Sequence, residues 1–314
     1  MPVDFTQYRF NFSLDVFDEP VKNFLKQQIK ELGYDPHELL PVIEVAIEHA
    51  KKFVDNREKV FLPPRILRSK IEEHAYLSLR GVISQGEKWK FLRERIKSYC
   101  SIFLVGAGLS FESGIPLTKV LEDLVNFCGV KNYDELRRDR EKCLKFKLEF
   151  KKICDKKQVG TSHRLIVKNF PEYILEIICL NWDNLIERAA KELNKVIHKV
   201  NEDTIVKNER YLWKFHGDVE NIEGRWVFPD EKGYVFNCFL DYIKRTELRN
   251  QMFIFVIVGY SEREEEIYEN IIHPFEKEPP RPTFRIGLNL ERLHEENYIV
   301  GPADFILKQI LPVK

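Results

Sequence analysis

Apolar residues change their spacing several times along this chain, and each change marks a predicted structural element. Over residues 5–17 apolar and polar side chains alternate, which is typical of a half-buried strand. From Glu19 onward the apolar positions recur at helical spacing, and Gly33 is expected to end the first helix. The same spacing predicts further helices over about 36–54, 65–82 and 86–99. The first hundred residues are therefore predicted to be mostly helical, serving packing, oligomerisation or a lid.

After this region, short apolar runs alternate with helical segments, and such runs indicate buried strands. The runs lie at 102–105, 173–180, 195–200, 212–215, 252–258 and 284–290. A highly charged helical insertion is predicted at about 119–171, a short hairpin around 225–228, and a last helix from about Ala303. The alternation predicts an α/β fold, a doubly wound (Rossmann-like) parallel sheet with helical insertions. We expect an N-terminal helical region at 1–99 and a ligand-binding domain at 100–314.

The composition narrows the class of protein. Lysine plus arginine and aspartate plus glutamate number 50 each among 314 residues, so no basic field argues for a nucleic-acid partner. The N-terminus does not read as a signal peptide, and no apolar stretch reaches the length of a membrane span. The six cysteines contain no CxxC pair, which argues against a structural zinc site. We expect a cytoplasmic protein without zinc, membrane contact or a direct nucleic-acid site.

The most specific string lies at residues 102–118 and reads IFLVGAGLSFESGIPLT. Its apolar start predicts a strand that runs directly into Gly106, Ala107 and Gly108, with Ser110 close behind. Glycines after a strand let the backbone approach a phosphate closely. The turn then offers N–H groups and the positive end of a helix dipole to the anion. A GxG alone is a weak signal, but the longer string predicts a nucleotide phosphate site.

Three further polar strings follow predicted strands: Asn181-Trp182-Asp183, His216-Gly217 and Gly259-Tyr260-Ser261. Taken singly, each has a plain structural explanation, since Asn181 could cap a helix, Asp183 could compensate its first turn, and the others could be turns. Ligands of doubly wound sheets bind at the carboxyl ends of the strands, and all four strings lie at such ends. A histidine titrates near neutral pH, which makes His216 a candidate general base.

Together the four strings resemble those of the sirtuin family. The first string matches the sirtuin pattern GAG-x-S-x-x-SGIP at every fixed position up to Pro116. The Asn-x-Asp, His-Gly and Gly-x-Ser strings then follow in the family's order. The resemblance covers about residues 100–314 and implies a domain that binds NAD+ as a substrate.

The resemblance also implies a role for each matching position. His216 would be the catalytic general base acting on a ribose hydroxyl. Asn181 would lie beside the nicotinamide ribose, and Asp183 would contact the nicotinamide carboxamide. The residues that would hold the pyrophosphate are Gly106, Ala107, Gly108 and Ser110. The residues that would line the adenosine half are Gly259, Ser261 and Asn289.

Two departures from the family pattern bear on the reaction. The protein deacylases continue the first string with Asp-Phe-Arg, whereas this chain has Leu117-Thr118-Lys119. The deacylases also carry a four-cysteine zinc module after His-Gly, whereas this chain has only Cys238 between His216 and Gly259. The layout is similar to the divergent, zinc-free sirtuin-like domains of prokaryotic antiviral defence. That resemblance implies control by homo-oligomerisation or by a partner such as a hexameric DNA translocase ATPase or an Argonaute protein.

The sequence therefore favours a regulated NAD+ glycohydrolase that releases nicotinamide and ADP-ribose. Two alternatives stay open. One is an NAD-dependent protein deacylase or ADP-ribosyltransferase, against which the missing zinc module argues. The other is a non-catalytic module that senses NAD+ or ADP-ribose, against which the triad of Asn181, Asp183 and His216 argues, because a sensor has no need of a base beside the ribose.

Overall fold

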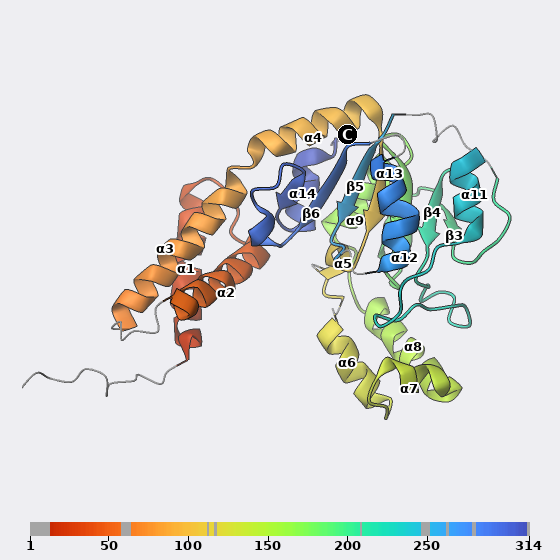
Figure 1. The fold of residues 1–314 in the computed structure, drawn as a ribbon, viewed down its shortest axis with the longest axis horizontal. Coiled ribbons are helices and arrows are strands. Elements are labelled where there is room, and N and C mark those ends of the chain that lie inside the picture. The colour runs from red at the N-terminus through yellow and green to blue at the C-terminus, as the bar shows by residue number, and fades with distance from the viewer. Residues whose placement is uncertain are drawn as a thin grey trace, which may run out of the picture.

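A parallel sheet forms the centre of the protein. The computed structural model describes residues 13–57, 64–111, 113–115, 118–207, 209–245, 252–261, 264–277 and 281–312. Seven strands pair in the order β3-β4-β2-β1-β5-β6-β7, and every pair is parallel (Figure 1). The strands are β1 (Ser101–Val105), β2 (Ile174–Cys179), β3 (His198–Val200), β4 (Tyr211–Lys214), β5 (Ile254–Val258), β6 (Thr283–Gly287) and β7 (Tyr298–Val300).

The order in which strands are added to the sheet changes side at β1. Val105 at the end of β1 pairs with Cys179 of β2 on one side and with Val258 of β5 on the other. After β1 the chain builds β2, β3 and β4 on one side, and only later builds β5, β6 and β7 on the other. The carboxyl ends of β1 and β5 therefore form the topological switch point, where ligands of doubly wound sheets bind.

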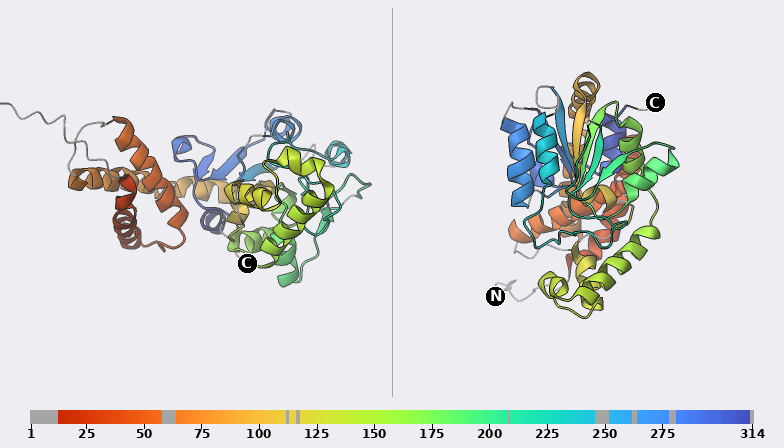
Figure 2. Two further views of the ribbon diagram at one scale, coloured as in Figure 1. Left: turned by 90° about the horizontal axis from the view of Figure 1, so that it is seen from below. Right: turned by 90° about the vertical axis from the view of Figure 1, so that its right-hand side faces the viewer.

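Helices cover both faces of the sheet, which confirms the predicted doubly wound fold (Figure 2). One face carries α4 (Gly86–Tyr99), α9 (Thr161–Asn169), α10 (Leu185–Glu192) and α14 (Ala303–Ile310). The other face carries α11 (Asn237–Arg245), α12 (Glu265–Ile267), η4 (Tyr268–Ile272) and α13 (His273–Lys277). The strands between these layers are almost fully buried, and their apolar side chains supply two hydrophobic cores.

The N-terminal helices extend outward from the β6–β7 end of the sheet (Figure 1). They are η2 (Leu14–Phe17), α1 (Asp18–Glu31), α2 (Leu40–Arg57) and α3 (Pro64–Ile83). The apolar stripe of α1 is buried against its neighbours, as the helical spacing predicts, and Gly33 follows the helix at φ +85°. The region is joined to the sheet by Gln85, whose amide exchanges two hydrogen bonds of 3.0 Å with the backbone of Val300.

A second group of helices lies beyond the carboxyl edge of the sheet (Figure 1). It comprises α6 (Thr118–Phe127), α7 (Tyr133–Arg138) and α8 (Arg140–Asp155), preceded by the single turn α5 (Gly108–Phe111). Helices α6, α7 and α8, with α9, form the helical insertion predicted at about 119–171. Among the described residues, none of the helices has both the length and the apolar character needed to cross a bilayer.

Three local predictions are wrong. The alternating pattern at 5–17 lies partly outside the described residues, and its described end is the 3₁₀ helix η2, because Ser13 Oγ accepts from the amide of Asp15. Residues 225–228 form no hairpin, because Trp226 and its neighbours pack on other aromatic residues instead of pairing with each other. The last predicted strand ends at Gly287, and β7 was not predicted.

Candidate functional site

The two glycine turns that follow β1 and β5 cross in direct backbone contact. A Cβ atom added to Gly108 would lie 2.7 Å from the Cα of Gly259, and one added to Gly259 would lie 2.6 Å from the Cα of Gly108. A Cβ added to Gly106 would lie 2.7 Å from the carbonyl oxygen of Gly259. Gly259 also has φ +62°, which favours glycine. The structure therefore brings these predicted residues together, and only glycine fits at the crossing.

The amide groups of the first glycine turn are largely used within the protein. Gly106 N donates to Val258 O and Gly108 N donates to Gly259 O, both at 2.9 Å. Ser110 N donates to Ala107 O at 3.1 Å, and the helix that begins at Gly108 is a single turn. The turn therefore has fewer free N–H groups and a weaker helix dipole than predicted. Its main contribution is that a ligand can approach the glycine backbone closely.

Asn181 ties the end of β2 to the glycine turn. Its Nδ2 donates to Gly106 O at 3.1 Å and to Ser110 Oγ at 3.0 Å. Ser110 Oγ in turn lies 3.2 Å from Nε2 of His163 on α9. All three side chains are buried, and burial lowers the pKa of His163, so its ring is neutral and can accept the hydroxyl proton. Asn181 is therefore not a helix cap but a link across the strand ends.

Asp183 lies in the turn that leads into α10. Its Oδ1 accepts from the amide of Leu185 at 3.1 Å, so part of its capacity is spent at the start of that helix. Its backbone carbonyl accepts a hydrogen bond from Nζ of the fully buried Lys214 at the end of β4. Burial alone would lower the pKa of Lys214, but neighbouring anionic groups, including Glu187, outweigh it and raise that pKa. A buried ammonium thus holds the Asp183 turn.

His216 follows β4 at the same edge and is buried. Burial lowers its pKa to about 4, although a hydrogen bond to the backbone of Leu180 acts in the opposite direction. Its Nε2 has no hydrogen-bond partner among the described residues. The ring is therefore neutral at physiological pH and keeps one nitrogen lone pair available, which is the state a general base requires.

An aromatic cluster covers this part of the edge. Trp182 packs at a tilt on Trp226, with ring centroids 5.0 Å apart, and meets Phe150 of α8 edge-on at 5.3 Å. The indole N–H of Trp182 donates to Val227 O at 3.1 Å, and Val227 N donates to His216 O at 2.8 Å. The helical insertion is thereby packed against the turns that carry Asn181 and His216, and it shields them from water.

The other predicted residues are more exposed. Ala107 is exposed at the tip of its turn, and Ser261 is exposed just beyond Gly259. Asn289 is exposed two residues after β6, where its Oδ1 accepts from the amide of Glu291 at 3.0 Å. These residues lie along the carboxyl edge of the sheet, as predicted, and among the described residues none of them contacts the His216 side chain through a hydrogen bond.

Sequence reasoning missed two residues that organise this edge. His163 lies in an ordinary helical pattern far along the chain from Ser110, and nothing local predicts their contact. Lys214 gave a weak signal, because a single lysine within the apolar run YLWKF is unusual for a buried strand. Both act through other residues, by holding Ser110 and the Asp183 turn.

Comparisons with known proteins agree with this arrangement. Residues 175–285 match the family model of the SIR2-like domain, and this segment contains Asn181, Asp183, His216 and Gly259. The predicted resemblance to the sirtuin family is therefore confirmed for this segment. The glycine turn at Gly106 lies outside the matched segment.

Individual relatives cover only part of the sequence. An NAD-dependent protein deacylase of Aggregatibacter actinomycetemcomitans is 32% identical over 108 residues, which are 33% of this chain and 50% of the deacylase. The chain thus spans about half the length of the curated relative it matches.

Two solved structures are similar in their chain path. One, from work on the mechanism and regulation of Sir2 enzymes, aligns with a TM-score of 0.48 and 16% identity, over 71% of this chain and 95% of its own. The complex of a Sir2 homologue with NAD aligns with a TM-score of 0.47 and 18% identity, over 70% and 93%.

Proposed function

We propose that this chain is an NAD+ glycohydrolase that converts NAD+ and water to nicotinamide, ADP-ribose and a proton. The carrying observation is His216, a buried neutral imidazole whose Nε2 has no partner among the described residues. Around it, the ends of β1, β2, β4 and β5 bring the glycine crossing and Asn181 to one edge. Base, amide and close backbone approach together suit cleavage at a nucleotide ribose.

The proposed chemistry assigns a step to each residue. A water oxygen forms a bond to the anomeric carbon of the nicotinamide ribose, and the carbon–nitrogen bond breaks with its electron pair leaving on nicotinamide. The proton passes to His216, directly or through a ribose hydroxyl. Asn181 orients the ribose, and Asp183 contacts the nicotinamide carboxamide. The glycine turn of Gly106 would receive the pyrophosphate.

The aromatic cover has a part in this reaction. A developing positive charge on the ribose is quenched by any nucleophile that reaches it, so hydrolysis needs one ordered water rather than bulk solvent. Trp182 and Trp226 close the site on the side of the helical insertion. Burial at this covered edge lowers the pKa of His216.

A deacylase or ADP-ribosyltransferase is the second candidate, favoured by the identity of 32% to an NAD-dependent protein deacylase. Against it stand Leu117-Thr118-Lys119 in place of Asp-Phe-Arg, and the single Cys238 in place of four cysteines. A non-catalytic sensor is the third candidate, and the buried His216 argues against it, because its Nε2 has no partner among the described residues.

The biological setting proposed here rests on the likeness to antiviral-defence domains set out above. We propose that residues 100–314 form the catalytic domain, and that residues 1–99 serve assembly or cover the site. Activity would be controlled by homo-oligomerisation or by a partner such as a translocase ATPase or an Argonaute protein.

The proposal is tested by incubating the purified chain with NAD+ at low and high protein concentration and separating nicotinamide and ADP-ribose by chromatography. Wild type should release both without any acylated peptide, and His216→Ala should release neither while still binding NAD+. His198→Ala, which removes an exposed histidine of the same domain, is the matched control. Release that requires an acyl peptide would favour the deacylase, and undiminished release by His216→Ala would refute the assigned base.

A further inference from the structure

A cavity of about 300 Å³ lies between the N-terminal helices and the carboxyl edge of the sheet. One wall is the face of α2 that runs from Glu44 to Lys52, and the opposite wall is the four-residue segment 288–291 after β6. Val45 and Leu288 supply apolar surface, and Asn289 supplies an amide. The volume is at the lower end of the range for small-molecule sites, and the mixture of apolar and polar lining is typical of them.

The cavity lies on the edge that carries the glycine crossing. β6 pairs directly with β5, and Gly259 N donates to Ile286 O at 2.9 Å, so the segment after β6 starts beside Gly259. Asn289 is the residue that the sirtuin resemblance places near the adenosine ribose. A dinucleotide that reached from His216 past Gly259 to Asn289 would therefore meet α2 at its adenosine end.

Residues next to α2 contact helices that pack on the sheet, and these contacts fix the wall formed by α2. Lys308 of α14 forms an ion pair with Glu38, which lies just before α2. Tyr34 packs edge-on against Phe305 of α14, with ring centroids 6.0 Å apart. Lys88, on the neighbouring α4, donates to the carbonyl of Glu295 beyond the opposite wall at 2.7 Å. The two walls are thus tied to the same body, and the cavity is part of the fold.

The cavity is acidic on both walls. Glu44, Glu48 and Glu291 line it, and Lys52 is the single lysine or arginine among its lining residues. Glu44 is paired with Lys22 at 2.9 Å. A nucleotide placed here would face mainly carboxylates, and carboxylates repel additional phosphate groups.

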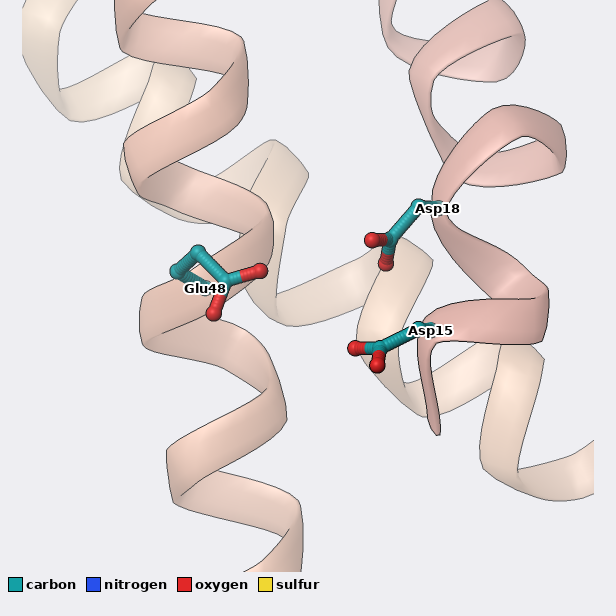
Figure 3. Close-up of side chains that lie close together, drawn as sticks. All are labelled: Asp15, Asp18 and Glu48. Carbon is teal, nitrogen blue, oxygen red and sulfur yellow. The ribbon is translucent and has the colours of Figure 1, made fainter. Parts of the chain in front are cut away.

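The charge of Glu48 is not cancelled by its surroundings. Its carboxylate lies 2.6 Å from Nζ of Lys51, but the same ammonium also pairs with Asp15 at 2.7 Å and Asp18 at 3.0 Å. Figure 3 shows these three carboxylates converging from α2, from η2 and from the first residue of α1. Three carboxylates share one ammonium, so the cluster beside the cavity keeps a negative charge.

We propose that α2 is a specificity-determining wall of the nucleotide site, at which Glu44 and Glu48 select an adenine nucleotide with a free 2′-hydroxyl over one with a 2′-phosphate. The inference rests on the proposed NAD+ site and extends it to a part of the chain that the sirtuin resemblance does not cover. A 2′-phosphate would add a dianion between the two acidic walls, where the exposed carboxylates of Glu44 and Glu48 repel it and where salt screens that repulsion.

The test is the ratio of NADP+ to NAD+ dissociation constants, measured by calorimetry on the full chain. Wild type should bind NAD+ roughly tenfold or more tightly than NADP+, and Glu44→Gln/Glu48→Gln should lower the ratio several-fold by improving NADP+ binding. The ratio of the wild type should also fall at high salt. Glu73→Lys, an exposed glutamate of α3, is the control and should keep the wild-type ratio. Melting curves on every variant confirm that the fold is intact.

Three outcomes separate the possibilities. A double variant whose ratio of dissociation constants equals that of the wild type overturns the selecting role of α2 while leaving the NAD+ site in place. This holds whether both affinities change equally or neither changes. Equal affinity of the wild type for both nucleotides overturns it as well. A wild type that binds neither nucleotide overturns the proposed function itself, and the inference with it.

Discussion

Acidification is expected to destabilise the folded protein through His216, in a manner that a single substitution removes. Burial lowers the pKa of His216 from 6.5 to about 4, so the unfolded chain binds a proton in this pH range more readily than the folded one. The stabilising contribution is therefore complete above pH 6.5 and is lost as the pH falls toward 4. His216→Asn cannot take up this proton and should lack the effect.

The size of the effect follows from the two pKa values. A shift of one unit corresponds to about 1.4 kcal/mol, so the loss between about pH 8 and about pH 5 is on the order of 2 kcal/mol. The free energy of unfolding of wild type minus that of His216→Asn should fall by this amount over that range. At about pH 5.5 about 97% of the folded rings would still be neutral, against about 9% for an unperturbed histidine. The rate of NAD+ cleavage should therefore fall little at this pH, because most of the His216 rings remain neutral and able to act as the base.

The assay is urea unfolding at a series of pH values, with the difference between the two proteins taken at each. The difference is needed because other buried groups also titrate: burial lowers the pKa of His163 as well, and raises the pKa of Glu176 to about 7. His198→Asn, which removes an exposed histidine of the same domain, is the control variant. A flat or rising difference for His216→Asn toward acid pH would refute the assignment of a buried, uncharged ring.

Three further substitutions test two positions at the edge and one buried carboxyl within β2. Asn181→Ala should lower the free energy of unfolding by about 1–3 kcal/mol in urea titrations, because Gly106 O and a buried hydroxyl lose their donor; unchanged stability would contradict this role. Gly108→Ala should cost about 1–3 kcal/mol and weaken NAD+ binding in calorimetry, because its Cβ would lie 2.7 Å from the Cα of Gly259, whereas a tolerated alanine would mean that the crossing yields. Burial raises the pKa of Glu176 to about 7, so the wild type loses unfolding free energy as the pH rises from 4.5 through 7. Glu176→Gln lacks this loss, and its unfolding free energy should gain about 2 kcal/mol relative to wild type between about pH 5 and about pH 8. A difference that stays constant with pH would show that the folded protein does not bind this proton more tightly than the unfolded chain.

The sequence was informative wherever one short string determines a local conformation. The run from Ile102 into the glycine turn predicts both a buried strand and a close backbone approach, and the structure has both. The polar strings at Asn181, His216 and Gly259 were expected at strand ends, and strand ends align in any parallel sheet. The fold and the edge that carries the candidate site could therefore be predicted from residue pattern alone.

The sequence was uninformative wherever a property depends on distant partners. The contact of Ser110 with His163 joins residues on different elements, and no local pattern encodes it. The neutral state of His216 results from burial under the helical insertion, which cannot be read from the His-Gly string. The hairpin predicted near Trp226 failed for the same reason, because its aromatic side chains found partners on α8. The roles of the site residues and the division at residue 99 stay predictions.

The central position of β1 in the sheet determines which parts of the protein can fold during translation. Ser101 pairs with Ile174 on one side but with Ile254 on the other, so β1 waits through most of translation for its second neighbour. The helices α1, α2 and α3 contact one another at short sequence separation and can fold together while β1 still lacks β5. The glycine crossing forms only when Gly259 emerges. A nascent or truncated chain that stops before β5 would thus have folded N-terminal helices but could not bind a dinucleotide.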